Sequence, residues 1–255
     1  MTAMDELRTW VINLDRAPER LQRITTQLER LGIAWTRHPA VDGRTLTPEQ
    51  RAALDEPAFH RKHGMTPVAG ELGCYLSHVE VMREFVGSPA SFALILEDDV
   101  LLHDSLPAVL KGLVANPDRW DMVKLSAVHS GTPVPVLELA PGYQLAVMLS
   151  RCTGSSAYVI NRRAARAYLD GLLPMSLPVD QVIDKGWQFG IKVRMVTPTP
   201  CTHDDRIATT ILGVSATVSR KFHWTKRLPT YAYRVGNELR RGAYAISQLL
   251  REKLQ

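Results

Sequence analysis

Phe92-Ala-Leu-Ile-Leu-Glu-Asp-Asp-Val100 is the stretch that decides the fold, because five apolar residues lead directly into three adjacent carboxylates. A run of this kind is typical of a buried strand whose exposed end carries an acidic site. Glu97, Asp98 and Asp99 repel one another, so an apolar setting destabilises them unless a cation or hydrogen-bond donors neutralise their charge. A hard divalent cation such as Mn2+ or Mg2+ takes oxygen ligands and would do so. The alternative is a solvated turn in which Asp104 and Ser105 cap a following helix.

The segments around this strand alternate between strand and helix patterns. Residues 9–14 predict a strand, residues 18–31 a helix with one apolar face, and residues 34–41 a second strand. We expect further helices at 72–86, at 107–115 and from 162, and further strands at 91–96, 121–125, 157–160 and 191–196. A strand-helix-strand start implies a parallel pair joined by a crossover, with functional groups past the carboxyl ends of the strands. The sequence therefore predicts an α/β fold with a mostly parallel central sheet flanked by helices.

Length and cysteine content limit the kind of protein. A chain of 255 residues is long enough for one large domain or two small ones. The three cysteines, Cys74, Cys152 and Cys201, are far apart and lack Cys-x-x-Cys spacing, so we expect neither disulfides nor a zinc site. The first residues carry acid where a signal peptide carries base, and no apolar run is long enough for a membrane span. We therefore expect a cytoplasmic protein.

Positive charge is concentrated at the carboxyl end. Residues 219–255 hold nine Lys or Arg and two Glu, a balance of +7, so residues 1–218 carry −2 of the net +5. We treat 1–218 as the main domain and 219–255 as a basic amphipathic helical tail, in which apolar residues recur at helical spacing. One interpretation is a helix that lies on an anionic membrane, and the other is a helix docked on its own domain with its basic face in water. No recognised nucleic-acid motif accompanies the charge, so we expect no nucleic-acid partner.

Neither Gly-x-Gly-x-x-Gly nor a phosphate-binding loop occurs, so a nucleotide would need a metal and cations to hold its phosphates. Segments rich in Pro and Gly near 43–70 and 130–142 are expected to be loops that border the site. Within the first of them, His60 and His63 are interpreted as solvated loop residues.

Five ordered blocks carry a resemblance to glycosyltransferase family 25, the family of lipooligosaccharide and lipopolysaccharide galactosyltransferases that also includes collagen galactosyltransferases. They are Val-Ile-Asn-Leu-Asp-Arg (11–16) with Arg20, Ala-Val-Asp-Gly (40–43), Gly-Glu-Leu-Gly-Cys-Tyr-Leu-Ser-His (70–78), Leu-Glu-Asp-Asp-Val (96–100) and Pro-Val-Asp (178–180). The resemblance spans about residues 9–205 and leaves the tail outside. It implies a GT-A-like nucleotide-sugar-binding fold, a UDP-hexose donor and Mn2+ (or Mg2+) held by a motif similar to Asp-x-Asp.

The resemblance also implies roles for single residues. The acidic motif departs from strict Asp-x-Asp because Glu97 stands first. By analogy Asp99 binds the metal directly, Glu97 binds the metal or touches the ribose, directly or through water, and Asp98 belongs to the nucleotide site. Asn13, Arg16, Arg20 and Asp42 would lie near the nucleotide, although Arg16 and Arg20 alone would also suit a helix start and Asp42 a turn before glycine. Within the block 70–78, the residues expected to meet donor or acceptor sugar are Glu71, Ser77 and His78, against a structural role for a lone histidine.

Three further residues are candidates. Lys124, at the end of a predicted strand, would approach phosphate or remain an ordinary lysine. Asp180 is our candidate for the base that takes the acceptor's proton in an inverting transfer, against a role as a helix cap. His203 is a candidate third metal ligand.

The predicted activity is metal-dependent transfer of a hexose, galactose by family resemblance, from a UDP-sugar to a glycan acceptor of the lipooligosaccharide or lipopolysaccharide type, with inversion. Two other classes stay open. A metal-dependent phosphoesterase would also use an acidic strand end, but needs more His and Asp ligands than the sequence offers. A non-catalytic nucleotide-sugar-binding module would keep the fold without turnover.

Overall fold

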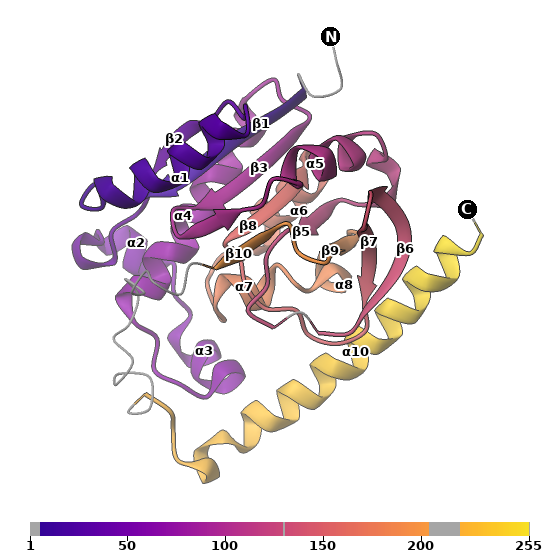
Figure 1. Cartoon of the computed structure of the whole chain (residues 1–255). Helices are drawn as coiled ribbons and strands as arrows, with labels where there is room; N and C mark the ends of the chain where they lie inside the picture. The colour runs from indigo at the N-terminus through magenta and orange to yellow at the C-terminus, as the bar shows by residue number, and fades with distance from the viewer. Residues whose placement is uncertain (1–5, 130, 204–219, 255) are drawn as a thin grey trace.

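A computed structural model describes residues 6–129, 131–203 and 220–254 of the chain. Its centre is an eight-stranded sheet in the order β2-β1-β3-β8-β5-β9-β7-β6 (Figure 1). The strands of this sheet are β1 (Leu7–Asn13), β2 (Thr36–Pro39), β3 (Phe92–Glu97), β5 (Met122–Lys124), β6 (Pro133–Ala140), β7 (Tyr143–Met148), β8 (Ala157–Asn161) and β9 (Val193–Thr197). A separate antiparallel pair joins β4 (Val100–Leu102) to β10 (Cys201–His203).

Most strands of the sheet point the same way. β1 runs parallel to both β2 and β3, and β5 runs parallel to β9. β8 lies antiparallel between β3 and β5, and β7 lies antiparallel between β9 and β6. Six of the eight strands therefore share one direction, with β8 and β7 reversed. The predicted α/β fold with a mostly parallel central sheet is confirmed.

Helices cover both faces of the sheet, and β3 explains why. Ala93 and Ile95 belong to one buried apolar cluster, while Leu94 and Leu96 belong to another. Because successive side chains of a strand point to opposite faces, a strand buried on both sides must be apolar throughout. The first cluster is covered by α4 (Ala69–Gly87) and α6 (Arg162–Gly171), and the second by α1 (Pro18–Arg30) and α5 (Leu106–Val114).

Two segments that we expected to be loops contain regular structure. The segment 43–70 holds the 3-10 turn η2 (Gly43–Thr45) and the short helices α2 (Pro48–Ala52) and α3 (Glu56–His63). The interpretation of His60 and His63 as solvated loop residues is therefore wrong: both lie in α3, where His60 is half-buried and His63 is buried. The segment 130–142 is mostly β6, which pairs only with β7 and so forms the edge of the sheet among the described strands. Proline is tolerated in an edge strand because one side of its backbone has no partner.

The remaining elements are α7 (Val179–Val182), α8 (Gly186–Phe189), the 3-10 turns η3 (Pro117–Arg119) and η4 (Trp224–Arg227), and the carboxyl-terminal helix α10 (Leu228–Glu252). α10 packs against α3, α8 and β7, and it runs along the lower right of the molecule in Figure 1. The predicted helical tail is confirmed. The proposed boundary at residue 218 falls in 204–219, outside the described residues.

α10 is docked on its own domain, as one of the two interpretations of the tail predicted, but the side that it turns inward is not the apolar one. Its buried residues are mostly polar, and Arg241 and Gln248 are 3% and 4% exposed. Leu239 and Ile246, on the opposite side of the helix, are 71% and 58% exposed. The helix therefore turns polar groups inward and apolar groups outward. Within the described part of the chain, no helix has the length and apolar character needed to cross a membrane.

Candidate active site

The acidic residues lie where the carboxyl ends of β1 and β3 meet. These strands are parallel neighbours paired through Ile12 and Glu97, so the loops that follow them open on the same edge of the sheet. A cavity of about 250 Å3 occupies this edge. Eight of the residues predicted for the site line it, namely Arg16, Arg20, Asp42, Ser77, His78, Glu97, Asp98 and Asp99. The other five, Asn13, Glu71, Lys124, Asp180 and His203, do not.

Glu97 is held from two sides. Its Oε1 accepts a hydrogen bond of 2.9 Å from the Ser155 hydroxyl and lies 3.4 Å from His78 Nε2. Burial by itself raises the pKa of Glu97, but the hydrogen bond and charge of His78 and the bond from Ser155 outweigh it. The pKa of Glu97 is therefore below its ordinary value, which favours an ionised side chain.

Asp98 is fixed by Asn13 and Arg20. Asn13 is the last residue of β1, is buried, and donates from Nδ2 to Asp98 Oδ2 at 2.7 Å. The Arg20 guanidinium forms an ion pair with Asp98 and a second one, at 3.0 Å, with Asp99 Oδ2. Because Arg20 is in the first turn of α1, the helix that follows β1, chain connectivity places this cation over the acidic loop after β3. Arg20 therefore neutralises part of the negative charge of the acidic cluster.

Asp99 remains incompletely neutralised. Burial and the charge of Glu97 raise its pKa to about 6, against the attraction of His203 and Arg20. Its Oδ1 is buried and has no hydrogen-bond partner among the described residues. The His203 Nε2 lies 3.8 Å from the other oxygen, because β10 returns antiparallel to β4 and pairs His203 with Val100. A buried carboxylate oxygen with no partner beside an imidazole is what a bound cation would satisfy.

Glu97, Asp99 and His203 as ligands of a divalent cation stay a prediction, which the approach of His203 to Asp99 supports. In the described part of the chain, the group whose ligand atoms all lie within 4.8 Å of one another is a different one, Cys74, His78 and Glu97. It suits a hard cation less well, since burial and the nearby acids raise the pKa of the Cys74 thiol well above its usual range. The nitrogens of His78 also face Tyr158 and Glu97 already.

The wall opposite the acids is the turn after β2. Asp42 begins η2 and accepts hydrogen bonds from the backbone and side chain of Arg44 and, at 3.0 Å, from Arg16 Nε. These bonds, those from the Arg44 side chain above all, hold the pKa of Asp42 well below its usual range. The turn touches α4 through two glycines: a Cβ on Gly43 would lie 2.3 Å from the carbonyl oxygen of Ala69, and one on Gly73 would lie 2.6 Å from that of Val41.

Residues of α4 support the cavity in different ways. Ser77 is buried, donates to the carbonyl of Gly73 and accepts from the Val41 amide at 2.8 Å, so it fixes the turn. His78 reaches Glu97 on one side and the hydroxyl of Tyr158, at 3.0 Å, on the other. Glu71 accepts from the Val68 amide, which caps α4, and pairs with Arg220 at 2.6 Å. Glu71 therefore links the helix start to the tail, and its part in sugar binding stays a prediction.

Asp180 and Lys124 lie together beside the cavity. Asp180 is in the first turn of α7 and accepts a 3.3 Å hydrogen bond from the Gly154 amide. Its charge, together with those of Glu97 and Asp99, contributes to the raised pKa of Cys74, which lines the cavity. Lys124 is 1% exposed, and its Nζ donates to the carbonyls of Cys152 and Asp180. Lys124 is thus a buried support for the loops that carry Asp180.

Sequence reasoning missed several residues of the site, which are Cys74, Ser155, Tyr158, Arg37 and Arg44. Arg37 donates to the side-chain oxygen of Asn13 at 3.1 Å, and thereby helps to orient the residue that holds Asp98. Cys74 lies inside the block 70–78, so its position was signalled. Ser155 contacts Glu97, and Tyr158 contacts His78, because β8 pairs with β3. No local sequence pattern predicts this pairing.

Comparison with known sequences bears on the same region. A sequence model described as "Glycosyltransferase family 25 (LPS biosynthesis protein)" matches residues 6–183, which include most of the site. The chain belongs to glycosyltransferase family 25.

Relatives within family 25 differ in their described activity. The chain is 30% identical over 192 residues to "Probable inactive glycosyltransferase 25 family member 3" of Bos taurus, covering 68% of this chain and 30% of that protein. It is 28% identical over 184 residues to "Procollagen galactosyltransferase 2" of Homo sapiens, covering 68% of this chain and 29% of that protein. It is 35% identical over 101 residues to "Glycosyltransferase 25 family member" of Drosophila melanogaster, covering 36% of this chain and 16% of that protein. The matched region is less than a third of the length of these relatives.

Proposed function

We propose that this protein transfers a hexose, galactose in the first instance, from a UDP-sugar to a glycan acceptor of the lipooligosaccharide or lipopolysaccharide type, with inversion. The observation that carries the proposal is the buried, partnerless Oδ1 of Asp99 in an acidic cluster at the floor of the cavity. The galactose assignment is supported by relatives described as procollagen galactosyltransferases, and the acceptor by the family's description as LPS biosynthesis proteins.

The donor diphosphate would lie between the acids and the cations of the cavity. Glu97, Asp99 and His203 would hold Mn2+ or Mg2+, which when bound supplies the positive charge that stabilises a departing diphosphate. Arg16 lines the cavity with a half-buried guanidinium and would contact the phosphates directly. Asn13 and Arg20 keep Asp98 and Asp99 in place, so their contribution is to the shape of the site before the donor arrives.

Asp180 is our candidate for the catalytic base. An inverting transfer needs a group on the side opposite the leaving diphosphate that removes the proton of the acceptor hydroxyl. Asp180 is presented by α7, a different element from those that carry the acidic cluster, and the Gly154 amide holds one of its oxygens. Lys124 keeps the backbone of Asp180 in position through its carbonyl.

A donor assay with a paired acidic substitution tests the proposal. Release of UDP from UDP-galactose, UDP-glucose and UDP-N-acetylglucosamine is measured with and without Mn2+ and with a truncated lipooligosaccharide acceptor. We expect acceptor-dependent release that requires the metal and that Asp99→Ala abolishes. The control is Asp104→Ala, which removes an exposed carboxylate a few residues away whose partner is Arg30. Activity of the Asp99 variant near that of the control, or release without metal, would refute the metal assignment, and release without an acceptor would instead indicate a hydrolase.

A second candidate is a nucleotide-sugar-binding module without turnover. It is favoured by the relatives of this family that are described as inactive, and by Arg20, which already neutralises part of the charge on Asp98 and Asp99. Titration calorimetry separates the two candidates. Metal-dependent UDP binding with no transfer to any acceptor would support the binding module.

A lipid-linked acceptor would require the protein to work at a membrane surface. We place that surface at the inner face of a bacterial membrane, and we propose that the basic tail makes the contact.

A further inference from the structure

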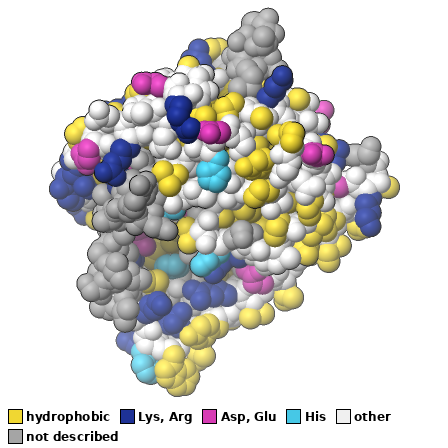
Figure 2. Space-filling view, in the orientation of Figure 1, with side chains coloured by type: hydrophobic (Ala, Val, Ile, Leu, Met, Phe, Trp, Pro, Cys, Tyr) yellow, Lys and Arg dark blue, Asp and Glu magenta, His cyan; other side chains and the backbone are white. Residues whose placement is uncertain are grey.

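The outward face of α10 is an exposed apolar stripe, in which the Tyr231 ring has the Arg227 guanidinium 5.2 Å from its centre. Its members recur at intervals of three, four and seven, which keeps them on one side of the helix: Leu228, Tyr231, Val235, Leu239, Ile246 and Leu250 in α10, and Leu254 just past its end. Their exposed fractions run from 39% for Tyr231 to 86% for Leu254. Hydrophobic side chains are visible along the lower right margin of the molecule, where α10 runs (Figure 2).

The stripe exists because the polar side of the helix is needed inside the fold. Arg241 pairs with Asp184 at 2.6 Å, and both side chains are 3% exposed. Arg194 reaches α10 from β9 and binds Gln248 at 2.9 Å and Glu252 at 2.8 Å. An amphipathic helix normally packs against its domain through its apolar side. Because α10 is fixed through its charged side, its apolar side remains exposed and can contact another apolar environment.

A basic hollow lies along one flank of the stripe. It has a volume of about 570 Å3, it is bounded by α6, α8, the start of β9 and α10, and its lining contains the cations Arg163, Lys192, Arg240 and Arg251 and no acidic residue. Trp187 lines the same hollow. Arg240 and Arg251 come from α10, and neither has a hydrogen-bond or ion-pair partner in the described parts of the chain.

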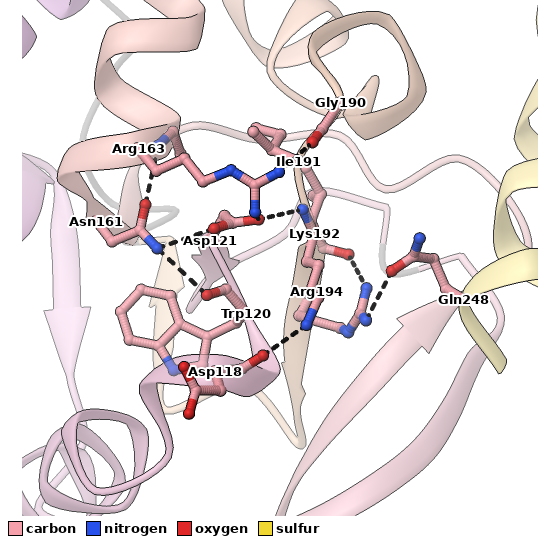
Figure 3. A network of polar contacts seen from close by, with 12 residues as sticks. Asp118, Trp120, Asp121, Asn161, Arg163, Gly190, Ile191, Lys192, Arg194 and Gln248 are labelled. Atoms are coloured by element: carbon pink, nitrogen blue, oxygen red, sulfur yellow. Dashed lines mark hydrogen bonds and ion pairs between the residues drawn. The ribbon is translucent and has the colours of Figure 1, made fainter. Parts of the chain in front are cut away.

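The opposite wall of the hollow is rigidly built. Figure 3 shows Asp121 at the centre of a network that holds the other two cations in place. The buried Asp121 accepts from the Lys192 amide at 2.7 Å, and the Arg163 guanidinium lies 3.5 Å from it while donating to the Gly190 carbonyl at 2.9 Å. Lys192 Nζ donates to the carbonyl of Asp118 at 2.6 Å. Asp121 therefore directs these chains to the hollow without itself lining it.

We propose that this surface, the stripe together with the basic hollow, docks on an anionic phospholipid bilayer. The stripe would enter the boundary between headgroups and acyl chains, and the hollow would receive headgroup phosphates. Trp224, which is 63% exposed just before the helix, adds a ring of the kind enriched at membrane interfaces. The charge favours lipid over a second copy of the chain, because two copies meeting through this face would bring like charges together. The inference gives the membrane contact suggested with the proposed function a defined surface, but it does not depend on sugar transfer.

Vesicle sedimentation of the full chain tests the proposal. The vesicles contain either phosphatidylglycerol mixed with phosphatidylethanolamine, or phosphatidylcholine alone. Two variants probe the two parts of the surface: Leu239→Glu with Ile246→Glu alters the stripe, and Arg240→Glu with Arg251→Glu alters the hollow. The control is Arg23→Glu with Arg51→Glu at exposed residues of α1 and α2, which makes the same change in net charge as the hollow variant and a larger one than the stripe variant.

We expect the wild type to bind the anionic vesicles and to release them as salt rises, with a partition coefficient at least about tenfold weaker for either surface variant and unchanged for the control. All substituted residues are exposed, so circular dichroism should show native folding in each case. Equal binding to both vesicle types, or wild-type binding by both surface variants, would overturn the proposal. So would a dimer in analytical ultracentrifugation that the stripe variant dissociates while no vesicles bind. Transfer to a soluble acceptor, measured in parallel, reports on the proposed function separately.

Discussion

Arg20 and Asp99 define the balance of charge in the site. Arg20 serves two carboxylates at once, and Asp99 keeps a raised pKa and a partnerless oxygen despite it. A cluster in this state leaves a buried oxygen that the proposed cation would satisfy. Because the pKa of Asp99 lies near 6, a proton competes with a cation for this site below about neutral pH.

Replacing Asp180 by Asn tests the proposed base. An amide of the same shape keeps the hydrogen bond from Gly154 but cannot take a proton, so we expect kcat to fall by about 10^2 to 10^4-fold with little change in UDP affinity. Initial rates and titration calorimetry measure the two quantities. Asp170→Asn, at an exposed position of α6, is the control. A variant at position 180 that turns over like the control would exclude this residue as the base.

The contact between α3 and α10 depends on pH through one buried histidine of α3. Burial, followed by the charges of Arg234 and Arg220, lowers the pKa of His63 from 6.5 to about 4. Its Nδ1 is buried and has no hydrogen-bond partner among the described residues, and its carbonyl accepts from Arg234 of α10. Protonation of His63 would therefore place a charge at the contact between α3 and the helix that docks on it.

The stability of the protein should depend on pH through this residue. Its folded pKa is depressed, so the unfolded chain takes up the proton first, and the stability present above pH 6.5 is lost as the pH falls towards 4. The loss amounts to at most about 3.5 kcal/mol, since the pKa falls by about 2.5 units and one unit corresponds to about 1.4 kcal/mol. We expect His63→Asn to flatten the fall in thermal midpoint between these pH values, while His129→Asn, at an exposed position, leaves it unchanged. Parallel profiles for wild type and the His63 variant would contradict the assignment.

At the level of elements, the periodicity of apolar residues and the positions of Gly and Pro between them predicted most of the sheet. The apolar run before Glu97 and the spacing of Leu21, Ile24 and Leu28 identified β3 and α1, because both depend on which face is buried. The hairpin of β6 and β7 was missed because Pro133 and Pro135 look like loop residues, and only the position at the sheet edge makes them compatible with a strand.

The residues of the candidate site also fall into a predicted group and a group that was not predicted. The acidic cluster and the block 70–78 were visible as local motifs, and eight of the predicted residues do line one cavity. Ser155 and Tyr158 were not visible, because their role depends on β8 lying beside β3. The side of α10 that faces the domain was not predicted, for a related reason. Its periodicity was correct, but the pairing of Arg241 with Asp184 decided which side faces inward.

For the molecule as a whole, the Arg241 and Asp184 pair fixes the tail to the domain. Burial raises the pKa of Asp184, which the charges of Lys124 and Arg241 oppose, and the Arg241 guanidinium also lies 5.1 Å from the centre of the Trp187 ring. A buried pair of this kind contributes little net stability when intact, yet losing one partner leaves an uncompensated charge.

Removing Arg241 alone should therefore be costly. We expect Arg241→Ala to lower the free energy of unfolding by about 3 to 5 kcal/mol, and Arg241→Met combined with Asp184→Leu to restore most of it. Urea denaturation measures both. Arg240→Ala, at the exposed neighbouring position, should stay within about 0.5 kcal/mol of wild type. If Arg241→Ala matched that neighbour, the tail would be held by other contacts.

Because α10 turns its polar side inward, mutations on its two sides have different consequences. Mutations on the inner side impair folding, since they disturb buried ion pairs. Mutations on its outer side escape that test, because exposed leucines give no stability in water. Those leucines would therefore erode to polar residues over generations unless something outside the protein rewards keeping them.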